Sequence, residues 1–208
     1  MEPGVFGGEA SGQGKAARTR AKLMDAAISV FARTGLEAGS INEIAAQAEV
    51  ANGTFYNHFR DKDELVSCVA LAMAGDVARQ LNEEMEGVAS AAERTSYATR
   101  RFVEIAVSRP EWGWVLARAL PALGELRRPV MAYARADMDM GVASGEFKIE
   151  VDDFTADIFV SMVTTAVLAR LRGEAGEEAG CKAAELQLRL LGVAPARAKT
   201  LAWRALAG

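Results

Sequence analysis

Four side chains that can hydrogen bond are concentrated in the short segment GTFYNHF, residues 53–59. On a helix of 100° per residue, Phe55 and Phe59 share one side at spacing i, i+4. The opposite arc then carries the polar side chains: Thr54, Tyr56, Asn57 and His58. A solvated helix face usually carries Lys and Glu, whereas these short or rigid groups include no acid and suit base edges and phosphate oxygens. The segment therefore predicts a surface that contacts double-stranded DNA.

Cations and a hydroxyl near this segment suit the phosphate backbone. Lys62 stands in the first turn of an expected helix, where the helix dipole already favours an anion, and Ser40 caps another expected helix. Arg18 and Arg20 belong to a basic stretch, residues 14–22, without any acid. The predicted DNA-contacting set is Arg18, Arg20, Ser40, Gly53, Thr54, Tyr56, Asn57, His58 and Lys62. For single members simpler interpretations stay open: an ordinary solvated helix start for the basic residues, and a half-buried anchor for Tyr56.

The elements that must position these residues can be read from hydrophobic spacing. A stripe at i, i+4, i+7 and i+8 predicts a helix over 15–34 that ends at Gly35: Leu23, Ala27, Val30 and Phe31. Ser40 with Glu43 forms a capping box before a two-turn helix, and residues 49–51 interrupt the pattern before Asn52 caps a helix over 53–59. This order of a long and two short helices is typical of a helix-turn-helix. Asp61 and Glu64 then open a long helix to about Val88.

Composition limits the class of protein. The 208 residues are 50% hydrophobic and 25% charged, which is typical of a folded chain. The total net charge of −4 argues against nucleic-acid binding. However, a cluster of basic residues without acids lies near the N-terminus, and this end is the candidate DNA-binding end. Cys68 and Cys181 lack metal-ligand spacing and are expected to be reduced packing residues. No apolar run of roughly 18 residues and no secretory signal is expected, which predicts a cytoplasmic protein that does not bind membranes.

The remainder of the chain is expected to be helical, so the predicted class is all-α. We expect about five helices after Ala91, of which 152–172 is the most continuous, followed by 182–191 and 195–206. The expected organisation is a disordered arm over 1–14, a helix-turn-helix domain over 15–62 and a helical domain for ligand binding and dimerisation over 63–208. No catalytic motif, metal-ligand cluster or cofactor motif is recognised, so no enzymatic activity and no cofactor are predicted.

Aromatic residues and methionines are frequent in the C-terminal half. Such polarizable side chains can line an adaptable apolar cavity, although at helical spacing they more often belong to an ordinary core. The candidate ligand-binding residues are Phe102, Trp112, Trp114, Leu116, Tyr133, Met138, Phe159 and Met162.

The segment from Arg20 to Leu65 resembles the tetracycline-repressor-like (TetR) family of bacterial regulators. The resemblance rests on GTFYNHFRDKDEL after INEIAAQAEVAN and on AAISVFARTGLEAGSI, with Phe55 where the family more often has Leu or Ile. It implies that Tyr56 and Lys62 contact phosphate and that Thr54, Asn57 and His58 lie in or beside the groove. It also implies a homodimer formed by two late helices of each subunit, for which the candidate residues are Phe154, Ile158, Met162, Ala166, Ala169, Leu186 and Leu190.

Sequence and resemblance together predict a homodimeric repressor that leaves a palindromic operator when a small apolar or amphipathic molecule binds. Two alternatives remain at this point. In the first, the C-terminal half binds a protein partner or only dimerises, without a small ligand. In the second, the chain is an enzyme with a helical fold, which the missing catalytic motifs disfavour.

Overall fold

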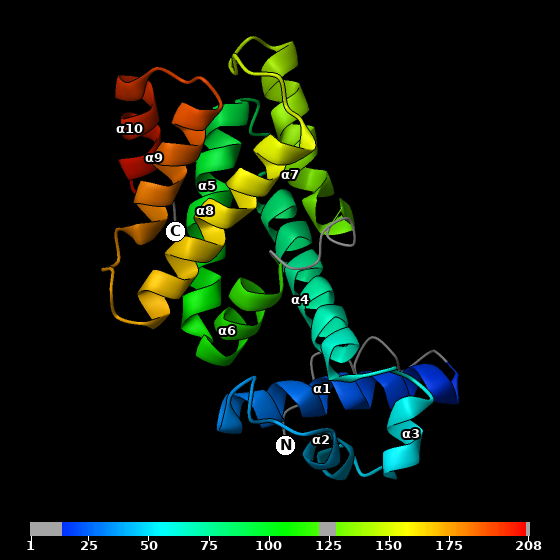
Figure 1. Cartoon of the computed structure of the whole chain (residues 1–208). Helices are drawn as coiled ribbons and strands as arrows, with labels where there is room; N and C mark the ends of the chain where they lie inside the picture. Colours follow the sequence, from blue (N-terminus) through cyan, green and yellow to red (C-terminus); the bar gives the residue numbers. More distant parts are fainter. Residues whose placement is uncertain (1–13, 121–127, 207–208) are drawn as a thin grey trace. The chain divides into compact units, whose positions relative to one another are not determined.

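The computed structural model describes residues 14–120 and 128–206, in which ten helices and no strands occur (Figure 1). The chain divides into two compact units, 1–70 and 71–208. The expected arm over 1–14 lies outside the described residues except for Gly14. The helices are α1 (Lys15–Thr34), α2 (Ile41–Gln47), α3 (Asn52–Tyr56), α4 (Lys62–Glu84), α5 (Ala91–Ser108), α6 (Pro110–Ala119), α7 (Arg128–Ala143), α8 (Asp153–Leu171), α9 (Ala179–Leu190) and α10 (Pro195–Trp203).

The N-terminal unit is built around the apolar stripe of α1, against which α2 packs, while α3 packs against α2. Its core contains the residues expected from the spacing, all of them buried: Leu23, Ala27, Val30, Phe31, Ile44, Phe55, Phe59 and Leu65. Gly35 ends α1 with a φ of 83°, a conformation that glycine adopts without steric cost. A Cβ on Gly39 would lie 2.9 Å from Cδ1 of Phe31, so only glycine lets this loop pack closely on α1.

Three predicted helix limits were wrong. The third helix was expected over 53–59, but α3 ends at Tyr56 because the next backbone N–H groups form tighter turns, such as His58 N to Phe55 O at 2.9 Å. Ala51, rather than Asn52, is the N-cap of α3, and the Asn52 amide donates instead to Oδ1 of Asn42. The long helix was expected to reach Val88, but α4 ends at Glu84 before Gly87, which has a φ of 83°.

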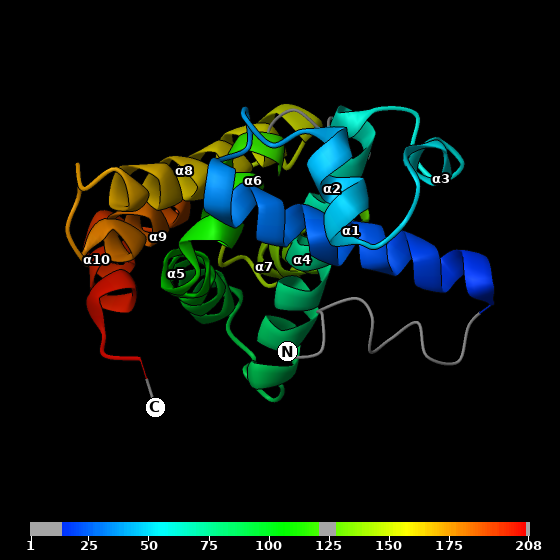
Figure 2. The ribbon, with the colours of Figure 1, turned by 90° about the horizontal axis from the view of Figure 1, so that it is seen from below.

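The C-terminal unit is a helical bundle in which α9 packs against α5, α8 and α10 (Figures 1 and 2). Six helices follow Ala91, one more than the approximate number expected, because Pro110 starts α6 directly after α5. One apolar cluster fills the space among α5, α7, α8, α9 and α10: Ala91, Ala92, Met138, Phe147, Phe159, Leu188, Leu191, Val193, Ala198 and Leu201. A second joins Val77, Leu81 and Met85 of the α4 segment to apolar residues of α5.

A fully buried amide links three of these helices. Gln187 on α9 donates from Nε2 to the carbonyl oxygen of Phe159 on α8 at 2.9 Å, and its Oε1 accepts from the hydroxyl of Thr99 on α5 at 2.5 Å. A buried polar side chain is tolerated only when its hydrogen bonds are made. Gln187 therefore fixes the relative positions of α5, α8 and α9.

Helix α8 is long and apolar enough to cross a membrane, with a mean hydropathy of 1.5, which corrects the expectation that no such stretch exists. It packs against α5, α6 and α9 as a core helix of the C-terminal unit. Only 33% of its apolar window is buried within the chain. Apolar surface of this helix is thus left uncovered by the described residues of the protomer.

Candidate DNA-binding surface and ligand cavity

The structure places the two phenylalanines of the 53–59 segment inside and its polar side chains outward. Phe55 and Phe59 are 0% and 1% exposed, and their ring centroids are 5.8 Å apart. Tyr56 is 60% exposed and Asn57 is exposed, whereas Thr54 and His58 are half-buried. The outward face expected from the sequence is therefore confirmed, with Tyr56 and Asn57 as its most accessible members.

The exposed ring of Tyr56 is held by the residue beside it. Its centroid lies 5.4 Å from that of Phe55 in an edge-to-face arrangement with an interplanar angle of 80°. Such a contact restrains the ring without burying the hydroxyl. Tyr56 consequently presents a preoriented hydroxyl group, which suits a contact with a phosphate oxygen.

Gly53 lies on the exposed side of α3, and a Cβ at this position would meet no atom within 4 Å. Its small size is therefore not required by packing within the protein. A glycine at such a position leaves room for another molecule to approach the backbone.

The short helix α2 is capped by the reciprocal bonds predicted for Ser40 and Glu43. Ser40 Oγ accepts from the backbone N–H of Glu43 at 3.2 Å, and Glu43 Oε2 accepts from the N–H of Ser40 at 2.9 Å. The hydrogen bond from the Ser40 hydroxyl lowers the pKa of the Glu43 carboxyl. Ser40 is exposed at this helix start, and both its backbone N–H and its hydroxyl donate to the Glu43 carboxylate.

Lys62 holds the loop between α1 and α2. Its Nζ donates to the carbonyl oxygens of Leu36, Glu37 and Gly39 at 3.1, 3.0 and 3.1 Å. An ammonium group has three N–H donors, and all three are engaged within the protein. The structure therefore gives Lys62 a role in holding this loop, which differs from the direct phosphate contact expected from the resemblance.

The two arginines predicted from the basic stretch have different surroundings. Arg18 is exposed on α1, as a phosphate contact requires. Arg20 is half-buried: its guanidinium lies 4.7 Å from the ring centroid of Phe59 and donates to Cys68 Sγ at 2.9 Å. Arg20 thus packs within the unit, and sequence spacing alone could not identify Cys68, 48 positions away, as its neighbour.

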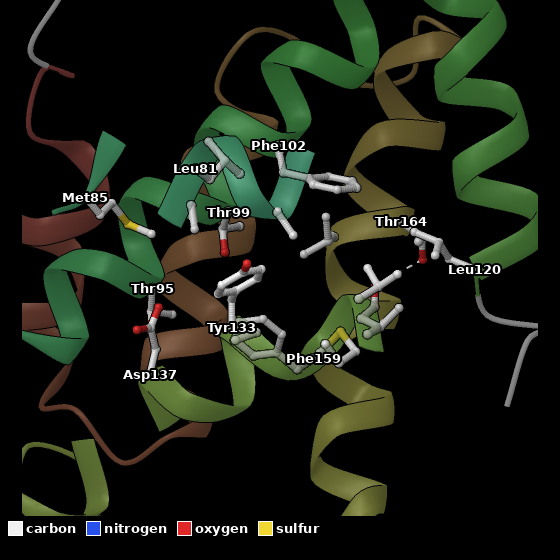
Figure 3. Close-up of a pocket in the computed structure, with 17 residues that line it drawn as sticks. Leu81, Met85, Thr95, Thr99, Phe102, Leu120, Tyr133, Asp137, Phe159 and Thr164 are labelled. Atoms are coloured by element: carbon white, nitrogen blue, oxygen red, sulfur yellow. Dashed lines mark hydrogen bonds between the residues drawn. The ribbon is translucent and has the colours of Figure 1, made fainter. Parts of the chain in front are cut away.

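A cavity of about 110 Å³ lies within the C-terminal unit, among α4, α5, α7 and α8 (Figure 3). Its walls are mainly aliphatic and aromatic. The described residues that line it are Ala78, Leu81, Met85, Thr95, Ala98, Thr99, Phe102, Leu120, Val130, Met131, Tyr133, Ala134, Asp137, Phe159, Val160, Val163 and Thr164.

Three of the eight predicted ligand residues line this cavity: Phe102, Tyr133 and Phe159. The other five do not: Trp112, Trp114, Leu116, Met138 and Met162. The two tryptophans instead pack beneath arginines, with Arg109 lying 4.6 Å from the ring of Trp112 and Arg118 lying 5.3 Å from that of Trp114. Leu116 and Met138 are core residues at 1% exposure, and Met138 lines a separate groove beside α7 and α8.

The sequence interpretation missed the polar end of the cavity, where Figure 3 shows Asp137 and Thr95. Asp137 is 7% exposed, and its Oδ1 accepts from Arg94 Nε at 2.5 Å. Burial raises the pKa of the Asp137 carboxyl, and the bond from Arg94 partly opposes that rise. The only sequence signal was an acid at an otherwise apolar position of an expected helix.

Arg94 donates hydrogen bonds to three acceptors within the protein. Besides Asp137, it donates from one terminal nitrogen to the carbonyl oxygen of Met85 at 2.8 Å and from the other to Oδ1 of Asn82 at 2.7 Å. The guanidinium therefore balances the buried carboxylate and joins the end of α4 to α5 and α7.

The predicted dimer residues lie on α8 and α9 with different exposures. Phe154 and Leu186 are 71% and 51% exposed. Four more are half-buried: Ile158, Met162, Ala169 and Leu190. Ala166 is 8% exposed and turned into the protomer, so it offers little surface to a second copy.

Comparison with known proteins agrees with both halves of this description. Residues 23–69 match the model of the bacterial regulatory proteins of the tetR family, and residues 90–204 match that of the tetracyclin repressor-like C-terminal domain. The solved structure of RolR in complex with the ligand resorcinol is similar, with 27% identity, a TM-score of 0.77 and coverage of 93% of this chain and 97% of that one.

Two curated relatives are also similar over much of the chain. The transcriptional repressor KstR2 of Rhodococcus jostii is 26% identical over 67% of this chain and 72% of its own length. The A-factor receptor protein of Streptomyces griseus is 32% identical over 79% of this chain and 62% of its own length. Because the C-terminal family model alone spans more than half of the chain, and the helix-turn-helix matches separately, this protein belongs to the TetR family of transcriptional regulators.

Proposed function

We propose that the protein is a ligand-responsive repressor that binds a palindromic operator as a homodimer and releases it when a small apolar or amphipathic molecule enters the cavity. The regulatory part rests on helix α4. Its first turn belongs to the N-terminal unit, whereas Ala78 and Leu81 of the same helix line the cavity. A ligand that displaces this part of α4 acts directly on the element that continues into the DNA-binding unit.

The DNA contacts proposed for each subunit come from the exposed face of α3 and its surroundings. Asn57, with Thr54 and His58 beside it, reads base edges, because amide and hydroxyl groups pair with them in the major groove. Tyr56, Arg18 and the backbone at Gly53 contact the phosphate backbone, and Ser40 caps the helix beside them. Lys62 supports these contacts by holding the loop before α2, and Arg20 supports them by packing under Phe59.

Dimerisation is proposed through the accessible apolar faces of α8 and α9. Phe154, Ile158 and Met162 follow one another at four-residue steps on α8, and Leu186 is the most exposed apolar residue of α9. A two-fold axis through such a surface makes it self-complementary. The two α3 helices would then read half-sites ~34 Å apart or a multiple of that distance.

Known ligands of relatives support a small-molecule effector. RolR binds resorcinol, and KstR2 is a repressor. Coupling energies of ~1 to 3 kcal/mol are typical between two sites of one protein and change operator occupancy several-fold to about a hundredfold.

The test is a fluorescence anisotropy titration on DNA from upstream of its own gene, with scrambled DNA of equal length as the control. We expect tighter binding to the upstream DNA, two protomers per site by native mass spectrometry, and dissociation when an effector is added. Equal affinity for both DNAs would refute the proposal of specific binding. If no small molecule that binds the protein dissociates the DNA complex, the proposed ligand response is refuted. That result would favour a regulator that only dimerises or binds a protein partner.

A further inference from the structure

The cavity in the C-terminal unit has properties that restrict the chemistry of its ligand beyond the function proposed above. Its volume of about 110 Å³ is below that of a cavity of about 150 Å³ that holds one benzene molecule in another protein. Pockets for drug-sized ligands measure ~300 to 1,000 Å³. Met85 and Met131 line the cavity, and their flexible side chains allow a small expansion. A single six-membered ring is therefore a ligand of matching size for the described cavity.

The walls favour an uncharged, flat and apolar body. Phe102, Tyr133 and Phe159 supply aromatic surface from three different helices. None of the described residues lining the cavity is Lys, Arg or His. The nearby Arg94 uses three of its five N–H groups on protein acceptors and is not among the described residues that line the cavity. An anionic ligand would thus lose its hydration without gaining a cation.

One group in the cavity can accept a further hydrogen bond from a ligand. Asp137 lines the cavity with a side chain that is 10% exposed, and Arg94 bonds to Oδ1, leaving the carboxylate with more acceptor capacity than this one bond uses. Thr95 lies at the same end of the cavity in Figure 3. A hydroxyl on the ligand can donate to the carboxylate, and a bond to a charged acceptor is stronger than one between neutral groups.

We infer that the cavity takes a neutral molecule of a single aromatic ring that carries a hydroxyl group, a small phenol, with its O–H donating to Asp137 and its ring between Phe102, Tyr133 and Phe159. This inference rests on the proposed function, because it assigns the effector class of the same cavity. It disfavours long-chain acyl compounds by the size of the described cavity and aromatic carboxylates by the absence of a cation from its described lining.

The experiment is isothermal titration calorimetry of the full chain with phenol, benzene, benzoate and palmitate as probes. We expect phenol to bind about tenfold or more tightly than benzene, since a hydrogen bond to a charged group contributes about 1.5 kcal/mol or more. Benzoate and palmitate should not bind measurably. Tighter binding of benzoate or palmitate than of phenol would overturn the assignment, as would equal binding of phenol and benzene.

Three variants locate the binding. Ala134→Leu fills the cavity and should abolish binding of phenol and benzene alike, whereas Ala143→Leu, exposed on the same helix, should leave both unchanged. Asp137→Asn replaces the charged acceptor with a neutral one, so the phenol-to-benzene affinity ratio should fall while benzene still binds. If Asp137→Asn does not fold, the comparison of Ala134→Leu with Ala143→Leu and the series of four probes still test the proposal. Phenol binding that survives Ala134→Leu would refute this location.

The same samples separate this inference from the proposed function. Anisotropy of the operator complex is measured while phenol is added. If phenol binds in the cavity and the complex stays intact, the ligand class stands and the proposed response fails. If another class of molecule dissociates the complex and phenol does not bind, the response stands and the ligand class fails.

Discussion

The ammonium nitrogen of Lys62 and the carbonyl oxygen of Gly39 are 3.1 Å apart, so the first residue of α4 holds the last loop residue before Ser40. Replacing Lys62 with Met keeps the apolar stem and removes three hydrogen bonds. We expect the free energy of unfolding to fall by about 1 to 3 kcal/mol, measured by urea denaturation. The exposed Lys22→Met is the matched control, and an unchanged midpoint for Lys62→Met would contradict the role in the loop.

The salt dependence of DNA binding distinguishes this role of Lys62 from a direct phosphate contact. A lost phosphate contact reduces the slope of log K against log salt by about one. Because all three donors of Lys62 are engaged with carbonyl oxygens, we expect Lys62→Met to weaken binding to all sequences equally and to leave the slope unchanged. A reduction by one unit would instead show that Lys62 moves to a phosphate in the complex.

Asn57 and Tyr56 should differ in what they contribute to DNA binding. Asn57→Ala should cost about 1 to 3 kcal/mol on the operator and little on scrambled DNA, since an amide reads base edges. Tyr56→Phe should weaken both by a similar factor, since a phosphate contact carries no sequence information. Both residues are exposed, so neither change should alter the melting temperature. Identical effects of the two substitutions on both DNAs would argue against the assignment.

Gly53→Ala separates DNA contact from folding. A Cβ at Gly53 meets open space, and Ala is better than Gly in a helix by up to about 1 kcal/mol, so the melting temperature should stay or rise. We expect the affinity for operator DNA to fall, because the added methyl group keeps the backbone away from a phosphate. Unchanged affinity in the anisotropy assay would mean that α3 does not approach the DNA at this point.

Glu146 should make the thermal stability of the C-terminal unit depend on pH. Burial alone would raise the pKa of its carboxyl, but hydrogen bonds from Ser90 and the backbone of Ala91 and Ala92, with the charge of Arg197, lower it overall. A lowered pKa contributes stability that is complete above the unfolded value of about 4.5 and is lost as the pH falls through the folded value. The melting temperature of Glu146→Gln should therefore be lower at neutral pH and fall less steeply below pH 4.5. The exposed Glu177→Gln should follow the wild-type curve.

The dimer surface can be tested at its most exposed apolar residues. A charge at Phe154 or Leu186 must be desolvated on association, so Phe154→Asp and Leu186→Asp should shift the native mass spectrum toward the monomer. Val142→Asp, at a residue 43% exposed on α7, is the control and should remain dimeric. Persistence of the dimer in both test variants would place the interface elsewhere.

The DNA-binding unit was largely predictable because its signals are local. The bounds of α1 follow from one apolar stripe and Gly35, and the capping box of Ser40 and Glu43 depends on two residues three positions apart. The carbonyl partners of Lys62 and the contact of Arg20 with Cys68 were not predictable, since these groups lie 23 or more positions away and are selected by packing.

The cavity was only partly predictable for the same reason. Phe102, Tyr133 and Phe159 were identified by residue type, but type could not separate them from Trp112 and Trp114, which pack under arginines. Asp137 and its partner Arg94 are 43 positions apart, and their pairing depends on how α5 meets α7. Helix packing decides which side chains face an internal cavity. The spacing of residues in the sequence does not reveal this packing.

The fully buried amide of Gln187 has a mechanical consequence for any molecule that occupies the cavity. Its two partners, Thr99 on α5 and Phe159 on α8, both line the cavity, and both are bonded to the Gln187 side chain of α9. A ligand that separates α5 from α8 must either break one of these buried hydrogen bonds or move α9. Leu186 lies on α9. Occupation of the cavity would thereby affect the proposed dimer surface at Leu186 without direct contact between the ligand and that surface.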